Sequence, residues 1–417
     1  MRRQEEGSRA VAEAVALCRP EVISAYPISP QTHIVEHLSD LVRTGDLAPC
    51  EYLMVESEFG ALSAAIGASA AGARTYTATA SQGLLYMAEA LYNASGLGLP
   101  IVMTVANRAI GAPINIWNDH SDSMSQRDSG WIQLYAESNQ EALDMHIQAY
   151  RIAEQVSLPV MVCMDGFVLT HAYEEVDIPD QRQVDEYLPR FEPRQLLDPA
   201  DPVTIGAMVG PEAFFEVKYL AHAKQIQALD AIPEASQHFA IRFGRSSGGL
   251  VRRYRMEGAE TIIVALGSVL GTIEEVADQM REAGIRVGVL GIKSFRPFPL
   301  DEVREALAGA ARVVVLEKAL AVGRGGIVST DIHEALQGSH IRSSTVVAGL
   351  GGRAITQASL RDLFERANRD ELGPLEFLDL DTDLVERELA RERNGRPPGP
   401  HAENILREIG AVAAEPH

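Results

Sequence analysis

Cysteine and basic residues are both scarce in this sequence of 417 residues. The three cysteines, Cys18, Cys50 and Cys163, form no CxxC pair, which argues against a disulfide framework, a zinc finger or a four-cysteine iron–sulfur cluster within the chain. Lys and Arg total 37 against 58 Asp and Glu, so the formal net charge is −21. Binding to nucleic acid or to an anionic membrane needs a basic face. We therefore expect a reduced, cytoplasmic protein that binds neither.

Long hydrophobic runs are also missing. The basic residues Arg2 and Arg3 are followed by acidic residues, where a secretory signal would continue with an apolar segment. The longest run of small apolar residues, Ala61–Ala73, is too short and too weakly hydrophobic to span a bilayer. The sequence thus predicts no targeting signal and no membrane span.

Three widespread catalytic motifs are absent as well. The glycine clusters Gly323–Gly326 and Gly349–Gly352 miss the GxGxxG spacing of nicotinamide-binding proteins, and no P-loop sequence occurs. The segment Gly67–Gly72 misses the nucleophile elbow of serine hydrolases. The cluster Gly323–Gly326 fits either an anion-binding nest before a helix or a tight turn between a strand and a helix.

What the sequence does contain is an alternation of short apolar runs with helical patterns. In the first half the runs are rich in β-branched residues and end at polar or turn residues, as buried parallel strands do. This pattern predicts the doubly wound α/β class. The expected strands are Val22–Tyr26, Thr75–Ala80, Pro100–Ala106 and Leu158–Asp165, and the expected helices are Ser57–Ala71, Gly83–Ser95 and Asn139–Val156.

A second α/β series follows a change of composition. Proline punctuates the chain from Asp177 to Arg255, which predicts a crossover and a long helix over roughly Pro211–Leu229. We predict three parts: an α/β domain over residues 1–230, a smaller α/β domain over 231–378, and a charged C-terminal arm over 379–417 that residues 394–400 break. The strands expected in the second domain are Thr261–Leu266, Arg286–Ile292, Arg312–Leu316 and Thr345–Ala348, and the helices are Thr272–Ala283 and Leu300–Leu307.

Candidate site residues follow the expected strands, because ligands of open α/β sheets bind beyond the carboxyl ends of the strands. The loop Pro27–Thr32 presents the hydroxyls of Ser29 and Thr32, and we expect Thr32 to cap the next helix. Taken alone, this segment also fits an ordinary strand–turn–helix connection.

Two charged residues are further candidates. Glu58 opens a helix of small residues, where it either favours the helix dipole or is a partly buried carboxylate that needs a hydrogen-bond donor. Arg108 follows the strand Pro100–Ala106, where it suits capture of a carboxylate or phosphate, or pairs with a neighbouring acid. The segment Trp117–Asp122 brings two acids to a histidine, which we interpret as a hydrogen-bonded loop near the site. We expect no metal ligands in this chain.

These motifs, in this order, resemble the α subunit of pyruvate:ferredoxin oxidoreductase over roughly residues 8–370. The segments that carry the resemblance are Tyr26–Thr32, Val55–Glu58, Thr79–Gly83, Val105–Arg108, Pro113–Asp122, Met164–Phe167, Gly267–Thr272, Phe295–Pro299 and Gly349–Gly352.

The resemblance implies thiamine diphosphate chemistry. The first domain is similar to the pyrimidine-binding domain of such enzymes, and the second to the transketolase C-terminal domain. By its position, Glu58 resembles the glutamate that bonds the aminopyrimidine N1′ of the cofactor, and Pro27 belongs to the same cofactor-binding region. Ser29, where the family usually has Thr, and Arg108 would hold the carboxylate of a 2-oxoacid.

The resemblance also implies a site shared between subunits. Related enzymes hold Mg²⁺ with a Gly-Asp-Gly sequence and a later Asn, but here Met164 precedes Asp165-Gly166 and no Asn occurs between Asn139 and Asn368. We expect Mg²⁺, the diphosphate site and the [4Fe-4S] clusters on β, γ and δ subunits, which also connect the chain to ferredoxin and CoA.

The expected function is therefore the reversible oxidative decarboxylation of pyruvate to acetyl-CoA and CO₂, with electrons passed to ferredoxin. Two alternatives remain open. One is the same reaction on a branched 2-oxoacid such as 2-oxoisovalerate, since the carboxylate clamp would be the same. The other is a non-catalytic scaffold subunit of such a complex.

Overall fold

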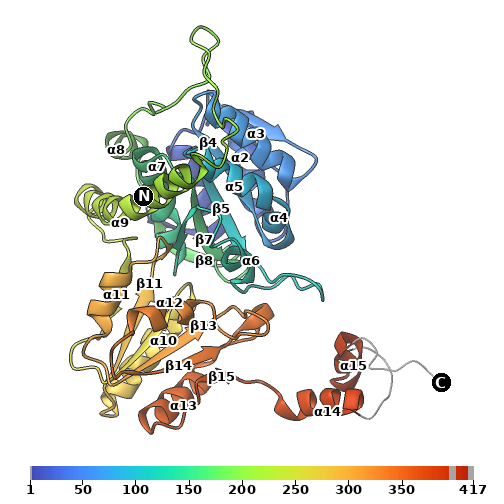
Figure 1. The fold of residues 1–417 in the computed structure, drawn as a ribbon, viewed down its shortest axis with the longest axis vertical. Coiled ribbons are helices and arrows are strands. Elements are labelled where there is room, and N and C mark those ends of the chain that lie inside the picture. Colours follow the sequence, from blue (N-terminus) through green and yellow to red (C-terminus); the bar gives the residue numbers. More distant parts are fainter. Residues whose placement is uncertain (1, 394–400, 412–417) are drawn as a thin grey trace, which may run out of the picture.

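The computed structural model describes residues 2–393 and 401–411. Figure 1 shows two helix-covered β-sheets, one formed by the N-terminal half of the chain and one by the C-terminal half. The break that the sequence predicts over residues 394–400 lies outside the described residues.

The first sheet has seven strands in the order β12-β6-β7-β5-β4-β2-β3. All neighbouring pairs are parallel except β12 with β6. The central strands β4, β5 and β7 are buried along their whole length, as strands between two helical layers must be. The strands are β2 (Val22–Ala25), β3 (Glu51–Met54), β4 (Thr75–Thr79), β5 (Val102–Asn107), β6 (Ile132–Tyr135), β7 (Val160–Asp165) and β12 (Ser294–Arg296).

Helices cover both faces of this sheet, and the predicted doubly wound α/β class is confirmed. One layer contains α1 (Gly7–Leu17), α2 (Thr32–Thr44) and α7 (Asn139–Val156), with α8 (Gln181–Tyr187) and α9 (Phe214–Phe243) packed outside it. The other layer contains α3 (Glu58–Ala70), α4 (Ser81–Tyr86), α5 (Ala88–Gly96) and the short α6 (Ser121–Ser125). A separate antiparallel pair joins β1 (Arg2–Glu6) to β8 (Tyr173–Asp177).

The second sheet has six strands in the order β15-β14-β13-β10-β11-β9, with β9 antiparallel to its neighbour β11. Its strands are β9 (Val251–Tyr254), β10 (Thr261–Ala265), β11 (Val287–Ile292), β13 (Arg312–Glu317), β14 (Arg342–Val347) and β15 (Leu375–Phe377). Its helices are α10 (Val269–Glu282), α11 (Leu300–Leu307), α12 (Val328–Ala335), α13 (Gln357–Asn368) and the 3₁₀ turn η1 (Leu350–Gly352).

The two halves share structure. The strand β12 comes from the C-terminal half of the chain but pairs with β6 at the edge of the first sheet. One cluster of buried side chains also runs from Trp131 and Tyr135 to Phe295 and Ile332. The domain division at residue 230 stays a prediction, and α9 runs through this position.

The helix α9 is longer than predicted. It continues from Phe214 to Phe243 through Pro233, although proline removes one helical hydrogen bond. Ala228, Ile232 and Phe239 are buried on this helix, and their packing favours its continuation. The predicted end at Leu229 was therefore wrong.

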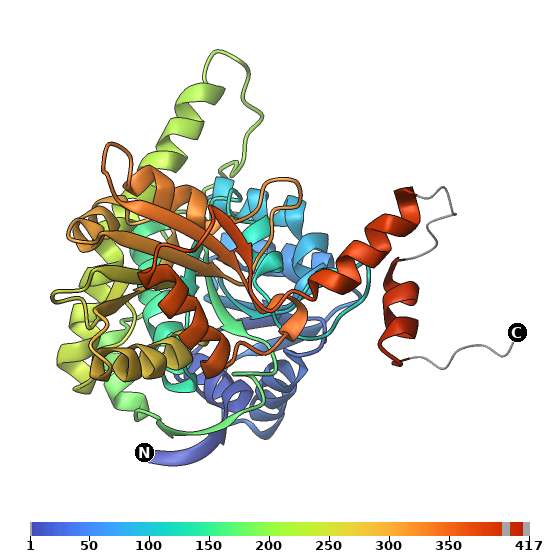
Figure 2. The same cartoon turned by 90° about the horizontal axis from the view of Figure 1, so that it is seen from below.

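Two parts extend away from the sheets in both views. One is the loop before α9 together with the start of that helix, and the other is the arm with α14 (Thr382–Arg393) and α15 (His401–Glu408) (Figure 2). In the described part of the chain, every helix is too short or too polar to cross a bilayer.

Two local predictions are resolved by hydrogen bonds. Thr32 is the first residue of α2, but Gln31 occupies the N-cap position and no side chain caps the helix, so the predicted cap was wrong. After Gly323–Gly326, the backbone N–H groups of Ile327, Val328 and Ser329 donate to Glu317 at 2.6, 2.9 and 3.2 Å. The chain thus places its own carboxylate at this helix start.

Candidate cofactor and substrate site

The candidate site lies where the order of the first sheet reverses. From β2 the chain crosses to β3 on one side, and then returns to β4 on the other side of β2. The loops after two such strands run in opposite directions and leave a crevice, which is the usual ligand site of this fold. The loop after β2, the start of α3 and the start of α4 all meet at this edge.

Gln31 holds the loop after β2 against the neighbouring strand. Its side chain is buried, and its Nε2 donates to the carbonyl oxygens of Tyr26 at 2.8 Å and Ala78 at 3.3 Å. Within the loop, Ser29 is exposed and Pro27 is half-buried. The loop therefore has a fixed base and an accessible tip.

Glu58 is the first residue of α3 and points toward α4. Ser57 caps the helix, with its Oγ accepting from the Gly60 N–H at 3.1 Å. The Glu58 side chain is buried and forms no hydrogen bond or ion pair with any residue that the structure describes. A Cβ built on Gly83 would lie 2.7 Å from Glu58 Oε1 and 2.6 Å from Thr79 Oγ1. Only glycine at position 83 leaves room for this carboxylate.

Arg108 follows β5 and reaches the loop after β2. It is buried, and it donates from Nη1 to the carbonyl oxygen of Ser29 and from Nε to that of Asn115, each at 3.0 Å. Both partners are backbone carbonyls, and Nη2 has no partner among the described residues. Burial lowers the pKa of Arg108, while the nearby Asp122 raises it. A guanidinium always carries its charge in proteins, so this one can attract an anion.

Asp122 ties these segments together. It is fully buried, and its two oxygens accept N–H groups from Ser81 and Arg108 at 2.9 Å and from Asn107 and Ser123 at 2.8 Å. Burial raises its pKa to about 6, even though these hydrogen bonds favour the charged form. Asp122 thus joins the start of α4, which faces Glu58, to the backbone of Arg108.

A second buried carboxylate, Asp165, ends β7 and connects the two sheets. It contacts His120 Nε2 at 2.8 Å, Lys318 Nζ at 3.1 Å and the N–H of Ser268 at 2.9 Å. Burial alone would raise the pKa of Asp165, but Lys318, His120 and Ser268 together lower it well below its usual value. Its oxygens are occupied by the chain itself.

The structure brings together some of the predicted residues and adds others. Ser29 and Arg108 are in contact, and Glu58 lies beside the strand end and helix start that Asp122 positions. The roles assigned to Pro27, Ser29, Glu58 and Arg108 stay predictions. No individual role was predicted from the sequence for Gln31, Thr79, Gly83 or Asp122, although all four lie in motifs that carried the resemblance.

These residues fit the aminopyrimidine end of thiamine diphosphate. Glu58 is a buried carboxylate without a partner, and Thr79 Oγ1 is a buried hydroxyl without one among the described residues. Burying unpaired polar groups costs free energy, so both favour a ligand with donors and acceptors. A Cβ at position 83 would collide with both groups, so glycine there lets them keep their positions.

Comparisons with protein families agree with this geometry. Residues 13–237 match the family described as pyruvate flavodoxin/ferredoxin oxidoreductase, thiamine diphosphate-binding. Residues 259–360 match the core domain II of pyruvate:ferredoxin oxidoreductase. The two matches follow each other along the chain, over the two sheets.

Individual proteins extend the similarity. The chain is 48% identical over 389 residues to pyruvate synthase subunit PorA of Methanosarcina barkeri, covering 91% of this chain and 97% of that protein. It is 39% identical over 362 residues to ketoisovalerate oxidoreductase subunit VorA of Pyrococcus horikoshii, covering 86% of this chain and 92% of that protein.

A solved structure shares the fold. The 2-oxoglutarate:ferredoxin oxidoreductase from Magnetococcus marinus superposes with a TM-score of 0.69 at 19% identity, over 88% of this chain and 65% of that one. The chain therefore spans somewhat less than two thirds of that protein. From the two family matches and the identity to PorA, the chain belongs to the pyruvate flavodoxin/ferredoxin oxidoreductase family.

Proposed function

We propose that this chain is the α subunit of a pyruvate:ferredoxin oxidoreductase, which converts pyruvate and CoA reversibly to acetyl-CoA and CO₂ and passes electrons to ferredoxin. The observation that carries the proposal is the buried, unpartnered Glu58 at the switch point of a thiamine diphosphate-binding fold. The names of the relatives with 46–48% identity, all pyruvate synthase subunits, support pyruvate as the substrate.

Within this proposal, thiamine diphosphate would supply the carbanion chemistry that cleaves the bond to the 2-oxoacid carboxylate. Glu58 would share a proton with the aminopyrimidine N1′ and so would set the proton distribution of that ring. Arg108 and Ser29 hold the substrate carboxylate, with the free Nη2 of Arg108 as donor. Asp122 fixes the position of the Arg108 backbone relative to the start of α4, because it accepts N–H groups from both.

The site would be completed by partner subunits. Asp165 is already bonded to His120, Lys318 and Ser268, so its carboxylate is a poor candidate for the Mg²⁺ that holds a diphosphate. Of the three cysteines, Cys18 and Cys163 are buried and burial raises the pKa of each thiol, which disfavours the thiolate that clusters need. We propose that β, γ and δ subunits carry the Mg²⁺ and [4Fe-4S] sites and the contacts with CoA and ferredoxin.

A branched 2-oxoacid is the second candidate substrate. The relatives named ketoisovalerate oxidoreductase subunit VorA are 38–39% identical to this chain, below the pyruvate synthase subunits. Rates with pyruvate and with 2-oxoisovalerate, measured side by side, distinguish the two, and we expect a preference for pyruvate.

The test is a CoA-dependent dye-reduction assay on the complex that co-purifies with this chain. We expect Glu58→Gln to lower the turnover number by about 100- to 10,000-fold, the range of a lost acid–base contribution. The matched control is Glu56→Gln, because Glu56 is exposed two residues away and should leave the rate unchanged.

Two results would contradict the proposal. One is a complex that, supplied with thiamine diphosphate, fails to reduce the dye with any 2-oxoacid, which would favour the scaffold alternative. The other is a Glu58→Gln complex that has lost assembly as much as activity, which would make Glu58 structural. Size-exclusion chromatography of both variants separates these outcomes.

A further inference from the structure

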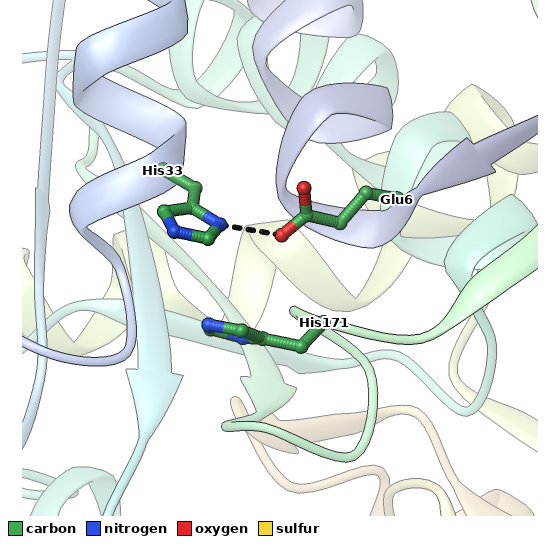
Figure 3. Close-up of side chains that lie close together, drawn as sticks. All are labelled: Glu6, His33 and His171. Carbon is green, nitrogen blue, oxygen red and sulfur yellow. Dashed lines mark hydrogen bonds and ion pairs between the residues drawn. The ribbon is translucent and has the colours of Figure 1, made fainter.

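Three residues outside the proposed active site converge beside the loop after β2. Glu6 ends β1, His33 is the second residue of α2, and His171 lies in the turn between β7 and β8. Within the described residues, they form the one group of three His, Cys, Asp or Glu side chains whose ligand atoms all lie within 4.8 Å of one another. Figure 3 shows the three side chains meeting from their separate segments.

The geometry leaves a nitrogen available on His171. Glu6 Oε1 lies 2.6 Å from His33 Nδ1, and the His33 and His171 rings pack with centroids 4.7 Å apart. Thr170 Oγ1 accepts from the Phe167 N–H at 2.8 Å and lies 2.8 Å from His171 Nδ1. Nε2 of His171 has no hydrogen-bond partner among the described residues, so it is the ring nitrogen left for a ligand.

The charges around the group suit a cation. Glu6 is buried, and the negative charge of a buried carboxylate favours a cation beside it. His171 is half-buried, and an imidazole binds a metal through an unprotonated ring nitrogen. The His33 side chain is 47% exposed, which leaves one side of the group open to water.

We propose that Glu6, His33 and His171 bind a first-row divalent transition metal such as Zn²⁺. Two imidazoles, one carboxylate and an open position form a donor set that suits these metals, whereas Mg²⁺ prefers oxygen ligands. With ligands about 2.0–2.1 Å from the metal, tetrahedral donors lie about 3.3 Å apart. Glu6 and His33 therefore separate slightly on binding, and His171 moves closer. The sequence predicts no metal ligands in this chain, and these three residues are far apart along it.

A metal at this position would brace the loop after β2 from outside. His33 is in the first turn of α2, directly after the loop that contains Ser29. On the other side, the His171 ring packs on Phe167, which packs on Trp117, with centroids 4.8 and 4.9 Å apart. The metal would thus join β1, α2 and the turn after β7. This inference does not rest on the proposed function.

The experiment is a zinc titration of the full chain, free of affinity tags and stripped with a chelator, in competition with a chromogenic chelator. We expect one tight equivalent of Zn²⁺ for the wild type. Loss of a ligand should weaken binding by more than about 10-fold, the effect of losing even a second-shell partner. Glu6→Gln and His171→Phe test the ligands with little change of shape, and His37→Ala, one turn along α2, is the control that should bind normally.

Thermal unfolding with and without Zn²⁺ provides a second readout. It compares each variant with itself, so a variant that is less stable than the wild type can still be tested. We expect Zn²⁺ to raise the Tm of the wild type and of His37→Ala, and to leave the Tm of His171→Phe unchanged. Two outcomes overturn the proposal. In one, Glu6→Gln and His171→Phe bind Zn²⁺ as the wild type does. In the other, the wild type binds no Zn²⁺. A lower Tm of Glu6→Gln would then identify the group as a metal-free ion pair.

Discussion

Asp122 and Asp165 are both fully buried near the carboxyl edge of the first sheet, but their surroundings differ in charge. Asp122 is held by four N–H groups, and burial raises its pKa to about 6. Asp165 is held by Lys318, His120 and Ser268, which lower its pKa well below the usual value despite burial. The charged form of aspartate is therefore destabilised at position 122 and stabilised at position 165.

The difference follows what each region joins. Asp122 joins loops at the edge of one sheet. Its hydrogen bonds with N–H groups position Arg108 and the start of α4. Asp165 joins two sheets, since Lys318 and Ser268 both belong to the second half of the chain. Ion pairs suit the second task, because breaking one leaves an uncompensated charge in the interior.

The largest expected effect is at the junction. Asp165→Asn leaves the buried Lys318 without its counter-charge, so we expect the free energy of unfolding to fall by about 3–5 kcal/mol. Urea unfolding at pH 7 measures this. The control is Asp301→Ala, which removes an exposed pair with Arg304 and should change stability little. Equal effects of both variants would mean that the ion pair of Asp165 with Lys318 stabilises the protein no more than an exposed ion pair does.

The next effect is on the pH dependence of stability. The pKa of Asp122 is raised to about 6 in the folded protein, so the folded state binds the proton more tightly than the unfolded chain does. The contribution of Asp122 to the free energy of unfolding is greatest below the pKa that it has in the unfolded chain. This contribution is lost as the pH rises through about 6. The total loss is about 3 kcal/mol, because one pKa unit is worth about 1.36 kcal/mol.

We expect the free energy of unfolding of the wild type, relative to Asp122→Asn, to fall by that amount between pH 3 and pH 7. Asp165 acts in the opposite sense: it stabilises the fold above its unfolded pKa, and that contribution disappears as pH falls through its lower folded pKa. Denaturant unfolding across this range provides both profiles. Parallel curves for the wild type and Asp122→Asn would contradict the assigned difference.

The smallest effect is on substrate binding. Asp122→Asn replaces one carboxylate oxygen by an NH₂ group that cannot accept hydrogen bonds, so either Ser81 and Arg108 or Asn107 and Ser123 lose their acceptor. We expect kcat/KM for pyruvate to fall by about 10-fold, mainly through KM, since one such bond is worth about 1 kcal/mol. Asp128→Asn, at an exposed position, is the matched control. A fall in kcat alone would give Asp122 a different role.

Elements with strong local signals were predicted well. The observed bounds of α7 and α11 are those expected from the sequence, because both helices have a periodic apolar face, and Ser138 caps α7. The strand β1 was missed, since Arg2–Glu6 is a charged run without alternation. It forms because β8, far along the chain, supplies its hydrogen-bond partners.

The candidate site divides in the same way. Motifs in the sequence led to Glu58, Arg108 and Ser29, because Arg108 and Ser29 follow predicted strands, Glu58 lies at the start of a predicted helix, and all three match the family pattern. Their spacing contains no information about partners, so the contact of Arg108 with the Ser29 carbonyl could not be foreseen. The roles of Asp122 and Gly83 likewise depend on which loops meet.

The sequence by itself determined the α/β class, the family and the residues at the strand ends, because periodicity and short motifs are local properties. Only the tertiary structure decided which of those residues share an environment. It buried Glu58 without a partner, gave Asp122 and Asp165 opposite surroundings, and brought Glu6, His33 and His171 together. The physical reason is that burial and charge pairing arise from contacts between distant segments, which the order of residues along the chain does not specify.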